Sequence, residues 1–82
     1  MDVDHLDPQQ IINVLGRNVR FHRQRLGYSQ EELAEKANLH RTYIGLIERG
    51  ENNPTILSYA KIAQVLNMSI FHLMHSHLPD AE

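Results

Sequence analysis

The sequence predicts an all-α domain of five helices. Every long apolar pattern in it repeats with the period of an α-helix, and no segment shows the alternation and hairpin turns of paired strands. Residues that cap helix starts precede the apolar segments, and glycine or asparagine follows several of them. A chain of 82 residues can form one small hydrophobic core.

The first helix is expected over residues 8–26. Asp7 is a good N-cap, Pro8 suits the first helical turn, and Gly27 is typical of the position just past a helix end. The apolar stripe that should face the core is marked by Ile11 or Ile12, Leu15 and Val19.

Two short helices are expected in the middle of the chain, over residues 30–37 and 41–49. Ser29 and Glu32 form a capping box, and Asn38 can adopt the left-handed conformation that a tight turn between helices requires. The shared interior of the two helices is apolar and comprises Leu33, Ala37, Leu39, Ile44 and Ile47. This layout is a helix-turn-helix, whose second helix presents its first residues to DNA bases.

Two further helices complete the expected fold. Thr55 caps a helix over residues 56–66, and Ser69 caps a last helix over residues 70–76. The stripe of the fourth helix that should be buried comprises Ile56, Tyr59, Ile62, Ala63 and Leu66.

We expect one domain over residues 8–77, with an acidic tail at 1–7 and a short tail at 78–82. Five of the ten acidic residues lie in the tails: Asp2, Asp4, Asp7, Asp80 and Glu82. The rest of the chain has five acidic residues and eight lysines and arginines, so this body carries +3 although the whole chain carries −2. This modest basic surface is compatible with double-stranded DNA as a partner.

Composition argues against several other functions. Without cysteine there is no disulfide, thiolate zinc site or cysteine nucleophile. No apolar run reaches membrane-spanning length and the chain start is no secretory signal, which favours a cytoplasmic location. We find no nucleophile–base pair, phosphate-binding glycine loop or paired carboxylates, and expect no enzyme activity, cofactor or small-molecule substrate. His72, His75 and His77 cluster without further ligands, so no metal site is expected.

Four motifs carry a resemblance to a known family. They are Leu-Gly-Arg-Asn-Val-Arg at 15–20, Gly-Tyr-Ser-Gln-Glu-Glu-Leu-Ala at 27–34, Tyr-Ile-Gly-Leu-Ile-Glu-Arg-Gly at 43–50 and Asn-Pro-Thr-Ile at 53–56. With them the chain resembles the phage-repressor-like, xenobiotic-response-element class of helix-turn-helix regulators. It looks most like the controller proteins of restriction–modification systems. The resemblance implies a lambda-repressor-like fold and a dimeric transcriptional regulator that binds a palindromic operator.

The candidate DNA-contacting residues lie in and around the second helix of the motif. Arginine can pair with guanine in a bidentate manner, while threonine and leucine can contact a thymine methyl group. We therefore expect base reading by Arg41, Thr42 and Leu46. In the class, residues matching Gln30, Tyr43 and Arg49 contact phosphates or flanking bases, and we assign Asn52 the same role.

Arg23 and Glu48 both fall on helix faces that should be buried, one turn after Val19 and Ile44 respectively. A charge in such a place needs a partner. Because the class often pairs these two positions, we expect a structural salt bridge between the first and third helices.

The last helix has more apolar residues than one buried face can hold. Ile70, Leu73 and Met74 can serve the core, which leaves Phe71 to point elsewhere. Together with Leu57 and Leu78 it forms a candidate dimer interface, since an exposed apolar patch often marks association. The alternative is that Phe71 folds back over the edge of the core.

A second function remains open on the same fold, that of a protein-interaction module of the antitoxin or coactivator type. Such a module would need fewer base-reading groups on its third helix. Arg41, Thr42 and Arg49 therefore favour DNA binding.

Overall fold

The computed structural model describes residues 7–75, and in this range it contains five helices and no strand. They are α1 (Pro8–Arg25), α2 (Gln30–Ala37), α3 (Arg41–Glu48), α4 (Ile56–Val65) and α5 (Ile70–His75). The all-α prediction is therefore confirmed. Of the expected tails at 1–7 and 78–82, only Asp7 is among the described residues, where it caps α1; the other tail residues, Leu78 included, and His77 lie outside them.

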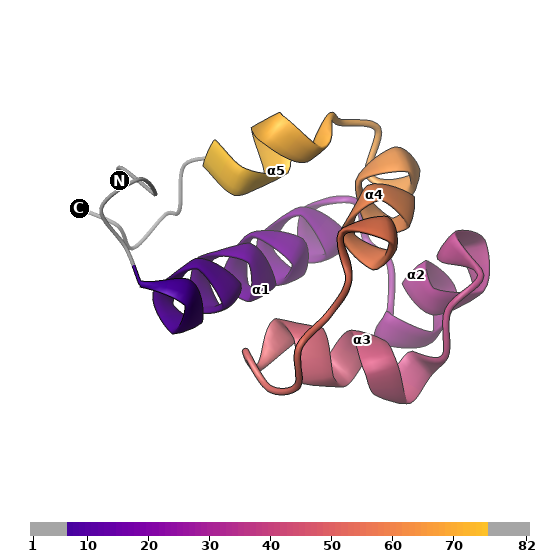
Figure 1. Cartoon of the computed structure of the whole chain (residues 1–82). Coiled ribbons are helices and arrows are strands. Elements are labelled where there is room, and N and C mark those ends of the chain that lie inside the picture. The colour runs from indigo at the N-terminus through magenta and orange to yellow at the C-terminus, as the bar shows by residue number, and fades with distance from the viewer. Residues whose placement is uncertain (1–6, 76–82) are drawn as a thin grey trace.

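Helix α1 runs through the middle of the domain, between α3 on one side and α5 on the other (Figure 1). Helix α2 packs against α3 and α4. A Cβ atom at Gly16 of α1 would collide with the carbonyl oxygen of Ile47 in α3, so glycine permits the close crossing of these two helices.

The helix starts are set by the capping residues that the sequence indicated. Asp7 and Ser29 each form a complete capping box, and Thr55 accepts a hydrogen bond from the backbone N–H of Ser58. Hydrogen bonds from Ser29 lower the pKa of the Glu32 carboxyl, because they favour its charged form. Asn38 ends α2 in the left-handed conformation, with φ 58° and ψ 46°, and this turns the chain into α3.

The core joins side chains from all five helices. Its fully buried members include Val19, Leu33, Ile44, Ile47, Ile62 and Leu73. One buried polar contact crosses it: Asn18 Nδ2 donates to the carbonyl oxygen of Leu73 at 2.6 Å, which ties α1 to α5. None of the helices in residues 7–75 has both the length and the apolarity needed to cross a lipid bilayer.

The expected burial of Ile56 is wrong, because its side chain is 76% exposed. The buried face of α4 is formed by Ser58, Tyr59, Ile62 and Ala63. Ile56 lies at the edge of that face and in the first turn, beyond the elements on which α4 packs. Leu39, expected in the interior of the helix-turn-helix, is half-buried and packs against the edge of the core.

Candidate nucleic-acid interface

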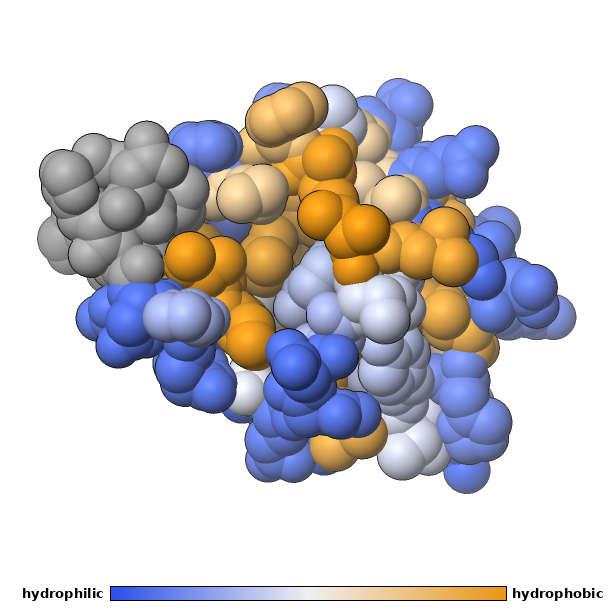
Figure 2. Space-filling model, viewed as in Figure 1, coloured by the Kyte–Doolittle hydropathy of each residue, from blue (hydrophilic) through white to orange (hydrophobic). Residues whose placement is uncertain are grey.

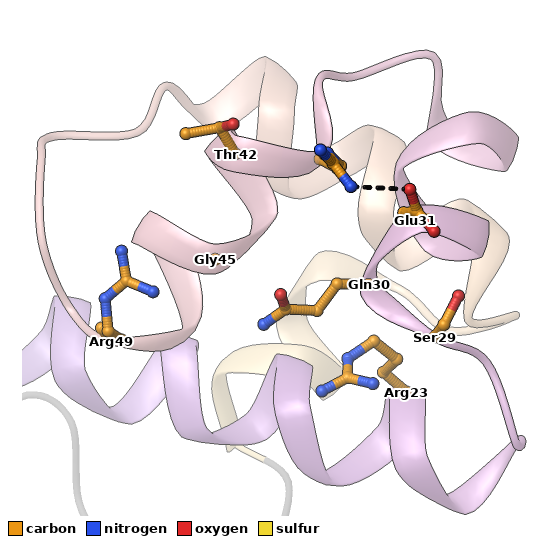
Figure 3. A pocket seen from close by; sticks show the side chains of 8 residues that line it. Arg23, Ser29, Gln30, Glu31, Thr42, Gly45 and Arg49 are labelled. Carbon is orange, nitrogen blue, oxygen red and sulfur yellow. Dashed lines mark hydrogen bonds and ion pairs between the residues drawn. The ribbon is translucent and has the colours of Figure 1, made fainter.

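An open groove lies along the helix-turn-helix, between α2 and α3. Four of the residues expected to contact DNA line it, namely Gln30, Arg41, Thr42 and Arg49. Gln30 and Arg41 are the first residues of α2 and α3, Thr42 follows Arg41, and Arg49 directly follows the end of α3. Figure 3 shows how Gln30, Thr42 and Arg49 lie in the groove. The groove does not include Tyr43, Leu46 or Asn52.

The start of α3 is held by a residue that the sequence did not indicate. His40 is the N-cap of α3, and its Nδ1 accepts a hydrogen bond from the backbone N–H of Thr42 at 3.1 Å. Histidine is not among the preferred N-cap residues, so the sequence gave no reason to expect a cap at this position. The cap fixes the start of the helix, where the exposed side chains of Arg41 and Thr42 project.

Behind the groove lies the buried carboxylate of Glu48, which accepts hydrogen bonds from several side chains. Arg23 donates to both oxygens of Glu48, from Nε at 2.6 Å and from Nη2 at 3.0 Å. Glu48 also accepts from Gln30 Nε2 at 3.0 Å and from Arg20 Nε at 3.4 Å. The Glu48 side chain has no solvent exposure and that of Arg23 has 10%. The structure therefore joins α1, α2 and α3 at this carboxylate.

This arrangement restricts what Gln30 can offer to DNA. One N–H of its amide is directed at Glu48, which leaves the second N–H and the carbonyl oxygen for the groove. The side chains of Gln30 and Arg49 approach the backbone at Gly45 from opposite sides (Figure 3). A Cβ atom at Gly45 would lie 3.2 Å from Arg49 Nη1 and 3.7 Å from Gln30 Oε1, so this glycine makes room for both.

The structure shows Gly45 buried beneath the two side chains that cover it. Arg49 is itself held by an exposed ion pair, with its Nε 3.2 Å from Glu51 Oε2.

The remaining candidate residues lie beside the groove. Tyr43 is half-buried, and its hydroxyl oxygen accepts a hydrogen bond from Ser58 at 3.1 Å, which leaves its own O–H able to donate. Burial and the nearby Tyr43 raise the pKa of Tyr59 to about 12, so Tyr59 stays neutral. Leu46 is half-buried rather than fully outward, and Asn52 is exposed with a φ of 68°.

A second surface of interest is apolar and lies away from the groove. Phe71 is 73% exposed and Leu57 is 61% exposed, and Ile56 adds to them. Figure 2 shows apolar side chains gathered over α5 and the start of α4. We call Ile56, Leu57 and Phe71 the apolar face. Leu78, expected to belong to it, lies outside the described residues.

A capped helix, a tight left-handed turn and a second helix with exposed Arg41 and Thr42 define a helix-turn-helix protein of the DNA-binding class. Residues 19–73 match the helix-turn-helix family (HTH_3), and the chain belongs to this family.

Among its relatives is the control protein C.SmaI of Serratia marcescens. It is 45% identical over 64 residues, which are 78% of this chain and 76% of that protein. The structure resembles that of the restriction–modification controller protein C.AhdI of Aeromonas hydrophila. The TM-score is 0.73 and the identity 34%, over 76% of this chain and 94% of that one.

The fold also resembles SinR, a master regulator for biofilm formation solved in complex with DNA. Here the TM-score is 0.69 and the identity 38%, over 73% of this chain and 97% of the solved chain. The match covers 56% of full-length SinR of Bacillus subtilis. The relatives are transcriptional regulators and not enzymes, and the chain is accordingly a DNA-binding regulator of transcription.

Proposed function

We propose that this regulator binds a palindromic operator as a homodimer and acts as a control protein of a restriction–modification system. The observation that carries the proposal is the exposure of Arg41 and Thr42 at the start of α3, at the mouth of one open groove. Recognition helices contact base edges with this end. The likeness to C.SmaI and C.AhdI supports the control function.

Within this proposal Arg41 reads a guanine and Thr42 an adjacent base in the major groove. Leu46 offers the exposed part of its half-buried side chain to a thymine methyl group. Phosphates and flanking bases are contacted by Gln30, Tyr43, Arg49 and Asn52. Tyr43 suits this role because its O–H can donate to a phosphate while Ser58 holds its oxygen in place.

We include a homodimer in the proposal because a single recognition helix contacts too few base pairs to select an operator. One recognition helix contacts few base pairs, whereas a two-fold dimer sets a second one about 34 Å away along the DNA. The apolar face supplies a surface for this association, with Leu57 and Phe71 as its centre. Leu78 is proposed as a further contributor.

The test is a selection from random DNA duplexes with the purified chain. We expect enrichment of a palindrome, and an affinity for it that falls steeply between 50 and 200 mM salt, as counterions are released from the phosphates. Selection without any enriched sequence would contradict the proposal. It would favour the protein-interaction module instead.

Two variants separate base reading from phosphate anchoring in the same experiment. Arg41→Ala should relax the preference at one base pair in each half-site, by about 5- to 100-fold. Tyr43→Phe removes only the O–H and should weaken binding evenly across sequences. If both variants give the same sequence profile, the assigned roles are wrong.

A further inference from the structure

An exposed ion pair bridges the two helices of the motif on the side of the groove. Arg41 Nη1 lies 2.8 Å from Glu31 Oε2, and the two side chains are 66% and 68% exposed. Figure 3 shows this contact reaching from α3 to α2. Exposed pairs of this kind contribute little to stability. A carboxylate beside DNA phosphates also weakens binding to every sequence. The pair therefore calls for an explanation other than stability or affinity.

We propose that Glu31 is a positioning residue that directs the guanidinium of Arg41 toward guanine and so sets base specificity. The inference rests on the proposed recognition of DNA by α3. Arginine has five N–H donors and the bond to Glu31 uses one of them. Within residues 7–75 no other acceptor binds Arg41, so four donors remain for the O6 and N7 atoms of guanine.

Glu31 is well placed to act as a fixed anchor. It follows Gln30, whose amide is bound by the buried Glu48, and it precedes Glu32, which closes the capping box with Ser29. Both neighbours are thus tied to the protein by hydrogen bonds. The backbone of the first turn of α2, from which the Glu31 side chain projects toward Arg41, is therefore set before DNA arrives.

Two physical effects then raise specificity. A free arginine side chain has many rotamers, and holding it in one orientation beforehand lowers the entropic cost of forming the guanine contact. The negative charge of Glu31 meanwhile disfavours sequences to which Arg41 gains no base contact. Such a repulsive element penalises incorrect partners more than it penalises the correct one.

The experiment compares Glu31→Gln with Glu35→Gln in the random-duplex selection and in binding titrations. Glu35 is a matched control because it lies on the same helix, is exposed, and makes no ion pair with a described residue. We expect E31Q to lose about tenfold preference for guanine at one position per half-site. It should bind random duplex as tightly as the unaltered chain or more tightly. E35Q should keep the full base profile.

A second comparison uses the Arg41→Ala background. Because Glu31 acts through Arg41, adding E31Q to R41A should leave the base profile of R41A unchanged. A further change at another base would overturn the positioning role.

Two other results overturn the inference. One is an unaltered E31Q profile on an operator that the unaltered chain selects, which leaves the proposed function intact. The other is tightening of operator and random binding by E31Q to the same extent, which reduces Glu31 to simple phosphate repulsion. If the unaltered chain selects no sequence at all, the proposed function itself fails and the inference fails with it.

Discussion

At the scale of single residues, Glu48 joins three helices through one buried carboxylate. The pairing of Arg23 with Glu48 could be inferred from their helical phases and the family resemblance. The contacts from Arg20 and Gln30 could not, because they depend on how α1 and α2 cross α3. The same is true of the Glu31–Arg41 pair. Local patterns encode which face of a helix is buried, and they do not encode which side chains meet across an interface.

Breaking the buried pair should be costly in single variants and less so in the double variant. Arg23→Met or Glu48→Leu alone should lower the free energy of unfolding by about 3–5 kcal/mol, since each leaves a buried charge without its main partner. The combination of R23M with E48L should recover much of that loss, as measured by chemical denaturation. Additive losses would show that the two side chains are not energetically coupled.

A surface ion pair serves as the control for this cycle. Arg49 and Glu51 are both about half-exposed. Arg49→Met should therefore change the free energy of unfolding by less than about 1 kcal/mol.

At the scale of elements, the expected helices agree with the observed ones to within a residue wherever their ends are described. This agreement has a local cause, because the side chains of Asp7, Ser29 and Thr55 each cap a helix by accepting a hydrogen bond from the backbone N–H three positions ahead. The exposure of Ile56 was not predictable in this way. It depends on where α4 extends past its neighbours, and the apolar period continues one turn beyond the buried contacts.

A buried histidine, His22, lies where α1 meets α5, and no hydrogen bond from a described residue offsets the burial of its ring nitrogen Nε2. His22 of α1 is 6% exposed, and its Nε2 has no hydrogen-bond partner among the described residues. The ring meets that of His72 edge to face, with centroids 6.3 Å apart. Burial lowers the pKa of His22 below its usual 6.5, and the nearby charges of Arg25 and His72 lower it further.

The chain should therefore lose stability when the pH falls below about 6.5. In that range the unfolded chain binds a proton at His22 that the folded chain resists, so the free energy of unfolding decreases with decreasing pH. His22→Leu should remove this part of the pH dependence, as measured by denaturation at pH 7.5 and 5.5. His75→Gln, at an exposed site of α5, should retain it. Equal pH dependence in the chain with and without His22 would contradict the assignment.

At the scale of the whole molecule, the groove and the apolar face belong to different parts of the domain. The groove lies along α2 and α3, whereas the apolar face lies over α5 and the start of α4 (Figure 2). This separation would leave the groove open in the proposed dimer, in which two copies meet through the apolar face. The sequence predicted the exposure of Phe71 from an excess of apolar residues in its helix, but the contribution of Ile56 emerged only from the packing.

Phe71→Glu should convert the proposed dimer into a monomer. A two-fold axis through this region would bring two carboxylates into one apolar interface, which is strongly unfavourable. Because Phe71 is 73% exposed, the variant should remain folded. Sedimentation should then report a monomer, and operator affinity should fall by about 100-fold or more, since the second half-site no longer binds as part of a linked unit.

Two matched changes distinguish loss of the interface from a general effect of charge. Phe71→Leu keeps an apolar side chain and should preserve both the dimer and its affinity. Gln24→Glu adds a negative charge at an exposed position of α1, outside the apolar face, and should leave the sedimentation unchanged. If F71E still sediments as a dimer with normal operator affinity, two copies associate through a surface other than the apolar face. Residues 1–7 would then be the next segment to alter.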